Sequence, residues 1–191
     1  MRRWLVRVAV VVLVVGVGLF VLDRLFLLNS GRADGSSSMA PTLPACDGRW
    51  IAEGFTYRFR DPRRGEIVVF HAVGRLGGTV APDPSARDLA LAKRVVGVPG
   101  DQVVGRDGRV YVNGFKSDDI RTANFPQVDL GGDEYFVLGD NRSLSQDSRD
   151  FGPVRRDAIF GRVFLVFWPL GDFGAPESRH AGAPAGEGLC D

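Results

Sequence analysis

The chain has 191 residues, 45% of which are hydrophobic, and a formal net charge of +1. This length suffices for one domain of ordinary size and a short additional segment. A net charge so close to zero provides no broad basic surface, which argues against a nucleic-acid-binding protein. The cysteines, Cys46 and Cys190, fit no zinc motif, and the sequence contains no phosphate-binding glycine loop and no cluster of histidines and carboxylates. We therefore expect neither a cofactor nor a metal ion.

The N-terminus predicts a membrane anchor. The run from Trp4 to Leu22 contains one charged residue, Arg7, and about 20 apolar residues suffice for a membrane-spanning helix. Together with Arg2 and Arg3, this arginine places the N-terminus in the cytoplasm by the positive-inside rule, and the rest of the chain outside. The alternative interpretation is a secretory signal that is cleaved near residues 31–33.

The rest of the chain predicts a mainly β domain. Phe55, Tyr57 and Phe59 alternate with other residues, which is typical of a half-buried strand, here over residues 50–59. Apolar runs predict further strands at residues 66–71, 93–98, 134–138 and 159–168, and a hairpin over residues 103–114 that turns at Asp107-Gly108. We expect antiparallel sheets that close into a barrel or a sandwich.

Polar segments separate these elements. Residues 29–35 are expected to be a short link, residues 72–88 a surface loop, and residues 115–132 an irregular flap. Residues 171–191 are low in complexity and are expected to be disordered. The predicted organisation is a cytoplasmic N-terminus and anchor at residues 1–28, an extracytoplasmic domain at 29–170 and a tail at 171–191. In such a location Cys46 and Cys190 either form a disulfide or remain free thiols.

Lysine is rare in this chain. Lysine and arginine total 24, and lysine occurs only at positions 93 and 116. Arginine stays protonated in proteins, whereas a buried lysine can lose its proton. Lys93 lies in an apolar strand, and a pKa lowered by about 2–3 units would make it neutral near pH 8. Arg94 would then face the opposite side of the strand, towards solvent or a carboxylate. The alternative is that Lys93 is exposed.

A serine nucleophile needs an adjacent base, and histidine is scarce as well. His180 lies in the predicted tail and His71 ends a predicted strand. Neither histidine is therefore a good candidate for a Ser-His-Asp triad, and a neutral lysine is the remaining common base. The cluster of Ser36, Ser37 and Ser38 has two interpretations, a flexible linker or the segment that carries the nucleophile.

Three stretches, in this order, resemble the sequence boxes of bacterial type I signal peptidases, the membrane-anchored Ser/Lys proteases that remove signal peptides. They are residues 36–43 (SSSMAPTL), 93–101 (KRVVGVPGD) and 139–149 (GDNRSLSQDSR). The resemblance extends over about residues 35–168. Leu91 and Leu144 depart from the family pattern, which leaves the lining of the substrate pockets open.

The resemblance implies a role for each matched residue. Ser38 corresponds to the nucleophile and Lys93 to its general base. Ser36 corresponds to the residue whose hydroxyl joins the backbone N–H of Ser38 in the oxyanion hole. Ser145 is expected to form a hydrogen bond with the lysine amine and to orient it. Four further residues are expected to support the site, the last two as an ion pair: Asp140, Arg142, Asp147 and Arg149.

By resemblance the chain is a serine endopeptidase that cleaves exported preproteins after small residues, at sites of the Ala-x-Ala type. Its expected partners are these preproteins, membrane lipid and the nearby secretion translocon, without nucleic acid. Three alternatives remain. One is a self-cleaving repressor, which would need a DNA-binding domain in place of the apolar N-terminus. The others are a specialised peptidase of a pilus or conjugation system and an inactive β domain that only binds exported chains.

Overall fold

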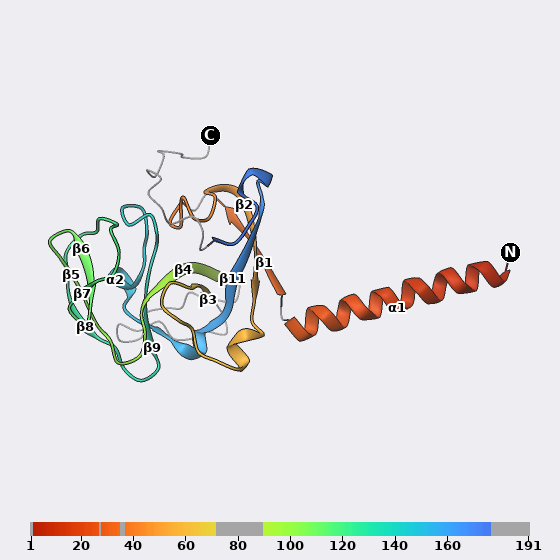
Figure 1. Cartoon of the computed structure of the whole chain (residues 1–191), viewed down its shortest axis with the longest axis horizontal. Coiled ribbons are helices and arrows are strands. Elements are labelled where there is room, and N and C mark those ends of the chain that lie inside the picture. The colour runs from red at the N-terminus through yellow and green to blue at the C-terminus, as the bar shows by residue number, and fades with distance from the viewer. Residues whose placement is uncertain (1, 27, 35–36, 72–89, 177–191) are drawn as a thin grey trace.

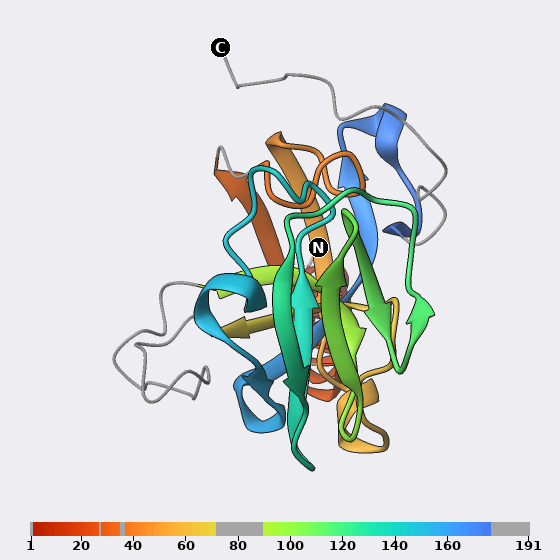
Figure 2. The same ribbon diagram turned by 90° about the vertical axis from the view of Figure 1, so that its left-hand side faces the viewer.

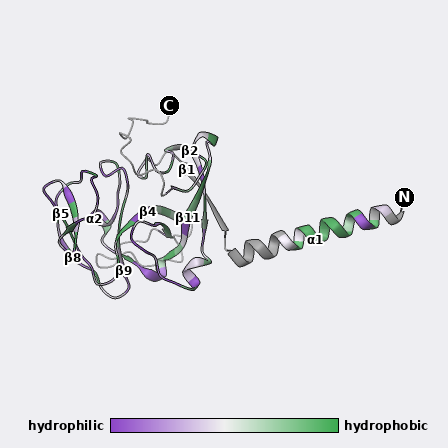
Figure 3. Ribbon diagram, viewed as in Figure 1, coloured by the Kyte–Doolittle hydropathy of each residue, from purple (hydrophilic) through white to green (hydrophobic). Residues whose placement is uncertain are grey.

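The computed structural model describes residues 2–26, 28–34, 37–71 and 90–176. Helix α1 (Arg2–Phe26) projects from a β-rich domain (Figure 1). The middle of this helix is hydrophobic (Figure 3), and valines such as Val11 and Val14 are exposed there. Within the described ranges, no helix meets the combined length and apolarity of a membrane span. The predicted helix is thus present, and its insertion into a membrane stays a prediction.

Two antiparallel sheets form the β domain. The main sheet has seven strands in the spatial order β1 (Leu28–Asp34), β2 (Cys46–Glu53), β11 (Ile159–Trp168), β3 (Ile67–His71), β4 (Ala90–Gly97), β9 (Glu134–Leu138) and β10 (Val154–Arg155). The small sheet has the order β7 (Phe115–Lys116), β6 (Arg109–Val112), β5 (Gln102–Arg106) and β8 (Phe125–Asp129). Figure 2 shows the small sheet in front of the main sheet, so the domain has two layers. The mainly β, antiparallel prediction is confirmed.

Apolar side chains on alternate residues hold the layers together. On β9, Tyr135 and Val137 pack in one apolar cluster, whereas Phe136 and Leu138 face the small sheet in another. This is the period of two that a strand imposes on its side chains. Strand β3 is buried on both faces, and its Phe70 has no exposed surface. Burial of one such side chain contributes about 1.5–3 kcal/mol to stability.

The predicted hairpin is present. Strands β5 and β6 pair from Val103–Val112 to Arg106–Arg109, and the turn between them is Asp107-Gly108. Both turn residues have positive φ angles, 52° and 69°. A two-residue hairpin loop of this type requires such angles, and Asp followed by Gly tolerates them.

Three local predictions were wrong. Aromatic alternation does not continue the strand beyond Glu53, because Tyr57 lies in a 3₁₀ turn, η1 (Thr56–Arg58), where its hydroxyl donates to Glu66. The predicted link at residues 29–35 contains β1, which pairs with the edge of β2. The predicted flap contains β7 and β8, because the edges of β6 and β5 offer them backbone partners.

The described chain also contains one short α-helix, α2 (Ser148–Phe151), and two further 3₁₀ turns, η2 (Arg156–Ala158) and η3 (Leu170–Asp172). After η3, Gly174 bridges Val166 of β11. The loop predicted at 72–88 and the rest of the predicted tail lie outside the described residues, and so do Ser36, His180 and Cys190.

Candidate active site

Ser38 and Lys93 meet inside the β domain although 55 residues separate them in the chain. The Nζ atom of Lys93 lies 2.6 Å from Oγ of Ser38. Ser38 begins a compact turn in which the backbone N–H of Leu43 donates to the carbonyl of Met39 at 2.9 Å. Met39 and Leu43 are both buried in an apolar cluster of the main sheet. Their packing fixes the turn, and with it the position of the serine hydroxyl.

Lys93 is placed on an apolar face of β4. Leu91 and Val95 share that face by strand alternation, and the cross-strand neighbour of Lys93 is the fully buried Val68. Only 3% of the lysine surface is exposed. Burial lowers the pKa of Lys93 from 10.5 to about 8, and the positive charge of Arg149 adds to this effect. The predicted buried lysine is thus present, and the amine can lose its proton at mildly alkaline pH.

Arg94, the next residue, faces the other side of β4. Its guanidinium donates two hydrogen bonds to the carboxylate of Asp140, at 2.8 and 2.7 Å, and both side chains are buried. It also donates to the carbonyl of Gly65. Removing one partner of such a buried pair typically costs about 3–5 kcal/mol. Asp140 therefore ties the segment after β9 firmly to the strand that carries Lys93.

Residues 139–149, which we call the site loop, surround the backbone of Ser38. The N–H of Asn141 donates to the carbonyl of Ser38 at 3.0 Å. Gly139 packs so closely that a Cβ atom there would come within 2.5 Å of the same carbonyl oxygen, and closer still to Oγ of Ser145. The loop thus holds the main chain of Ser38 from one side while the turn of residues 38–43 holds it from the other.

Asp147 and Arg149 form the expected ion pair. Nε of Arg149 lies 2.8 Å from Oδ1 of Asp147, whose side chain has no exposed surface. Asp147 also caps α2 and accepts a hydrogen bond from the N–H of Gly139 at 3.0 Å. Arg142 donates to the carbonyl of Gly139 at 2.9 Å. Both arginines therefore form hydrogen bonds within the site loop and stabilise its conformation.

Two predicted site residues do not show their expected contacts. Oγ of Ser145 is buried and has no hydrogen-bond partner, so the expected bond to Lys93 is not formed in this structure. Ser36 lies outside the described residues. His71 stacks on Phe160 with the ring centres 4.4 Å apart. In the described ranges no three His, Cys, Asp or Glu side chains gather in a way that could hold a metal ion.

Gly139→Ala should slow acylation of Ser38. The added Cβ has no room between the Ser38 carbonyl and Ser145, so the loop and Ser38 must shift apart. A misplacement of about 1 Å at the reacting groups typically lowers the rate about 10²-fold. Labelling of Ser38 by a serine-reactive acylating probe measures the effect. Gly132→Ala is the control, because nothing lies within 4 Å of its Cβ position. Equal labelling rates for the two variants would contradict this account of the site loop.

Lys93→Met should stabilise the folded protein at neutral pH. Between pH 8 and 10.5 the unfolded chain binds a proton that native Lys93 has released, so wild-type stability rises with pH across this window. The cost of the buried charge, about 3 kcal/mol, is therefore present in full below pH 8 and vanishes above 10.5. Methionine keeps the apolar stem and removes the charge. Urea unfolding at pH 7 and pH 9.5 should show a stability gain that shrinks with pH; a constant gain would count against the buried ammonium.

Comparisons with known proteins identify the family of this chain. A family model described as signal peptidase, peptidase S26, matches residues 1–168. "Probable signal peptidase I-2" of Synechocystis sp. is 41% identical over 168 residues, which cover 85% of this chain and 71% of that protein. Signal peptidase I of Leptolyngbya laminosa is 39% identical over 176 residues, which cover 88% of this chain and 81% of that protein. A crystal structure of a signal peptidase I from Enterococcus faecalis is 28% identical, covers 54% of this chain and 97% of its own, and has a TM-score of 0.42. The chain therefore belongs to the signal peptidase family, peptidase S26, whose members are serine proteases.

Proposed function

We propose that this protein is a membrane-anchored type I signal peptidase that uses Ser38 as nucleophile and Lys93 as general base. The observation that carries the proposal is the 2.6 Å approach of the lysine amine to the serine hydroxyl in a buried setting. The family and the names of its relatives support the substrate class, which is the signal peptide of an exported preprotein. An inactive binding domain would have no use for a buried amine at this position.

The reaction begins with neutral Lys93. Its amine takes the proton of Ser38 Oγ as this oxygen attacks the carbonyl carbon of the scissile peptide bond. The resulting oxyanion is stabilised by the N–H of Ser38 and the hydroxyl of Ser36. The Lys93 ammonium then gives its proton to the leaving amine, and the C–N bond breaks. Water attacks the acyl-enzyme with Lys93 again as base, which releases the acid and restores the Ser38 hydroxyl.

Ser145 completes the proposed site. Its unpartnered Oγ lies beside Gly139, at the loop that contacts Ser38. A buried hydroxyl without a partner costs about 1–3 kcal/mol, which a hydrogen bond to the Lys93 amine would recover. We assign to Ser145 the orientation of the amine when substrate occupies the site. Specificity for small residues, as at Ala-x-Ala sites, is proposed on the family resemblance.

The N-terminal helix has a role in the same proposal. Membrane lipid holds α1 by its apolar run, with three arginines on the cytoplasmic side, and the β domain lies outside the cytoplasm. Ser38 follows Leu22 by 16 residues in the sequence. The site would thus be tethered close to the membrane surface and near the translocon, where the cleavage sites of exported preproteins emerge.

Lys93→Arg should abolish cleavage of a preprotein with an Ala-x-Ala site. Arginine keeps the charge and nearly the length, but it does not lose its proton at working pH. In the wild type, turnover should rise through pH 8 as the Lys93 amine becomes neutral. Lys116→Arg is the control, because Lys116 is half exposed and pairs with Asp119. The lysine mechanism would be contradicted if folded Lys93→Arg protein turned over substrate at a near-normal rate. Loss of activity in His71→Ala would then indicate that His71 is the base.

The proposed topology predicts that protease added to intact spheroplasts digests the β domain. The arginines before the apolar run hold the N-terminus inside, so the domain after it is accessible from outside. An epitope tag at residue 180 and immunoblotting report the digestion. A cytoplasmic marker protein should survive the same treatment. Full protection of the tag in intact spheroplasts would reverse the proposed orientation.

A further inference from the structure

The segment between β7 and β8, residues 117–124, touches the site loop at both of its structural arginines. We call it the bracing segment. Oδ2 of Asp118 accepts a hydrogen bond from Nη2 of Arg142 at 2.7 Å. Oγ1 of Thr122 accepts one from Nη1 of Arg149 at 3.2 Å. The same segment was predicted to be an irregular flap, and no motif in the sequence marks either residue.

The bracing segment is itself fastened to the small sheet. The N–H of Ser117 donates to the carbonyl of Val110 at 2.9 Å, and the N–H of Thr122 donates to the carbonyl of Gly108 at 3.1 Å. The side chain of Asn124 accepts from the N–H of Gly108 at 3.3 Å. Within the segment, Oδ1 of Asp118 accepts from the N–H of Ile120 at 2.9 Å. Asp118 therefore projects from a fixed turn and not from a loose loop.

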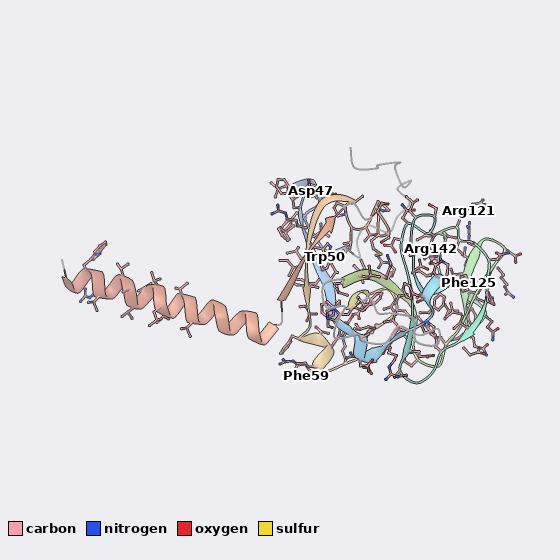
Figure 4. All side chains as sticks on the ribbon, turned by 180° about the vertical axis from the view of Figure 1, so that it is seen from behind. Asp47, Trp50, Phe59, Arg121, Phe125 and Arg142 are labelled. Carbon is pink, nitrogen blue, oxygen red and sulfur yellow. The ribbon has the colours of Figure 1, made fainter. Side chains whose placement is uncertain are left out.

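The contact between Asp118 and Arg142 leads to the nucleophile in two steps. Arg142 donates through Nε to the carbonyl of Gly139 at 2.9 Å. Gly139 packs directly against the carbonyl of Ser38, which also accepts a hydrogen bond from Asn141. A shift of Arg142 therefore moves the backbone that sets the distance between Ser38 and Lys93. Figure 4 shows Arg142 between the main sheet and the small sheet, where it can transmit such a shift.

Beside the Asp118–Arg142 ion pair, apolar contacts do little to join the bracing segment to the site loop. Asp118, Ile120 and Arg142 line an open pocket of about 660 Å³ together with Arg94 and Val96 of β4. Side chains that line such a pocket lack protein partner atoms across it and gain little dispersion energy from one another. At this place the bracing segment and the site loop are joined by a charged hydrogen bond, which is about twice as strong as a neutral one.

We infer that Asp118, supported by Thr122, is a positioning residue for the peptidase reaction: through Arg142 and Gly139 it fixes Ser38 relative to Lys93. The inference rests on the proposed Ser38/Lys93 mechanism. It gives the small sheet a part in catalysis, because the sheet holds the bracing segment and the segment holds the site loop. The hydrogen bonds of Asp118 join it to Arg142 and Ile120 and not to Ser38 or Lys93, so its effect should appear in the rate of the chemical step.

Asp118→Asn tests this specifically. The amide oxygen of asparagine can still accept from the N–H of Ile120, which keeps the turn, but its NH₂ group then faces Nη2 of Arg142, donor against donor. An acylating probe counts the enzyme molecules whose Ser38 is reactive. Turnover per labelled molecule should fall about tenfold, whereas KM should stay within about twofold of wild type. The labelled fraction should stay at the wild-type level, because a variant that merely unfolds loses labelled sites and not turnover per site.

Asp119→Asn is the matched control. Asp119 is the neighbouring carboxylate, its side chain is 84% exposed, and its partner is Lys116 and not the site loop. This variant should retain wild-type turnover, and Asp118→Glu should recover part of the loss because it restores a carboxylate opposite Arg142. Equal turnover per labelled site in Asp118→Asn and Asp119→Asn would overturn the inference.

Thr122→Val decides the question if Asp118→Asn fails to fold. It keeps the shape of the side chain and removes one acceptor of Arg149. Turnover per labelled site below wild type supports the inference, and wild-type turnover overturns it. A wild-type enzyme that cleaves preprotein while Ser38 resists acylation would overturn the proposed mechanism and this inference with it. Equal turnover of Asp118→Asn and Asp119→Asn, by contrast, would overturn the inference and leave the proposed mechanism in place.

Discussion

The burial of one amine is the constraint on which the rest of this structure depends. Lys93 is 3% exposed, beside Val68 and Val95, and its pKa falls to about 8 because water is excluded. An apolar site of this kind costs stability whenever the amine carries a proton. The fold therefore has to hold a destabilising group within 2.6 Å of Ser38. It does so by placing Lys93 on β4 and by holding Ser38 between the turn of residues 38–43 and the site loop.

Charges near Lys93 are arranged so that they limit this cost without cancelling it. Asp147 and Asp140 favour the ammonium form, and Arg149 opposes it. Each carboxylate is already bonded to an arginine, Asp147 to Arg149 and Asp140 to Arg94. Because these pairs are nearly neutral as units, the desolvation of the amine remains the largest influence on its pKa. A free carboxylate at the same place would hold the proton and remove the base.

The pairs also connect the two sheets to the site. Asp140 joins the site loop to β4 in the main sheet, and Arg142 joins it to Asp118 beside the small sheet. Gly139 sits between these anchors and has no room for a side chain. The loop around Ser38 is thus bonded to residues from both layers.

The sequence by itself determined the class of fold, most strand positions and the two residues that meet. Apolar runs at residues 66–71 and 159–168 correspond to β3 and β11, and Asp107-Gly108 to the turn of the hairpin, because these signals are local. The scarcity of lysine and histidine drew attention to Lys93, and the resemblance of three stretches to the signal peptidase boxes identified it as the expected base and Ser38 as the expected nucleophile. Tertiary structure alone decided the rest. It turned Tyr57 out of strand geometry towards Glu66, left Ser145 without its expected partner, and brought Asp118 to Arg142. Each of these outcomes depends on which distant side chain is within reach, and the local pattern of residues does not contain that information.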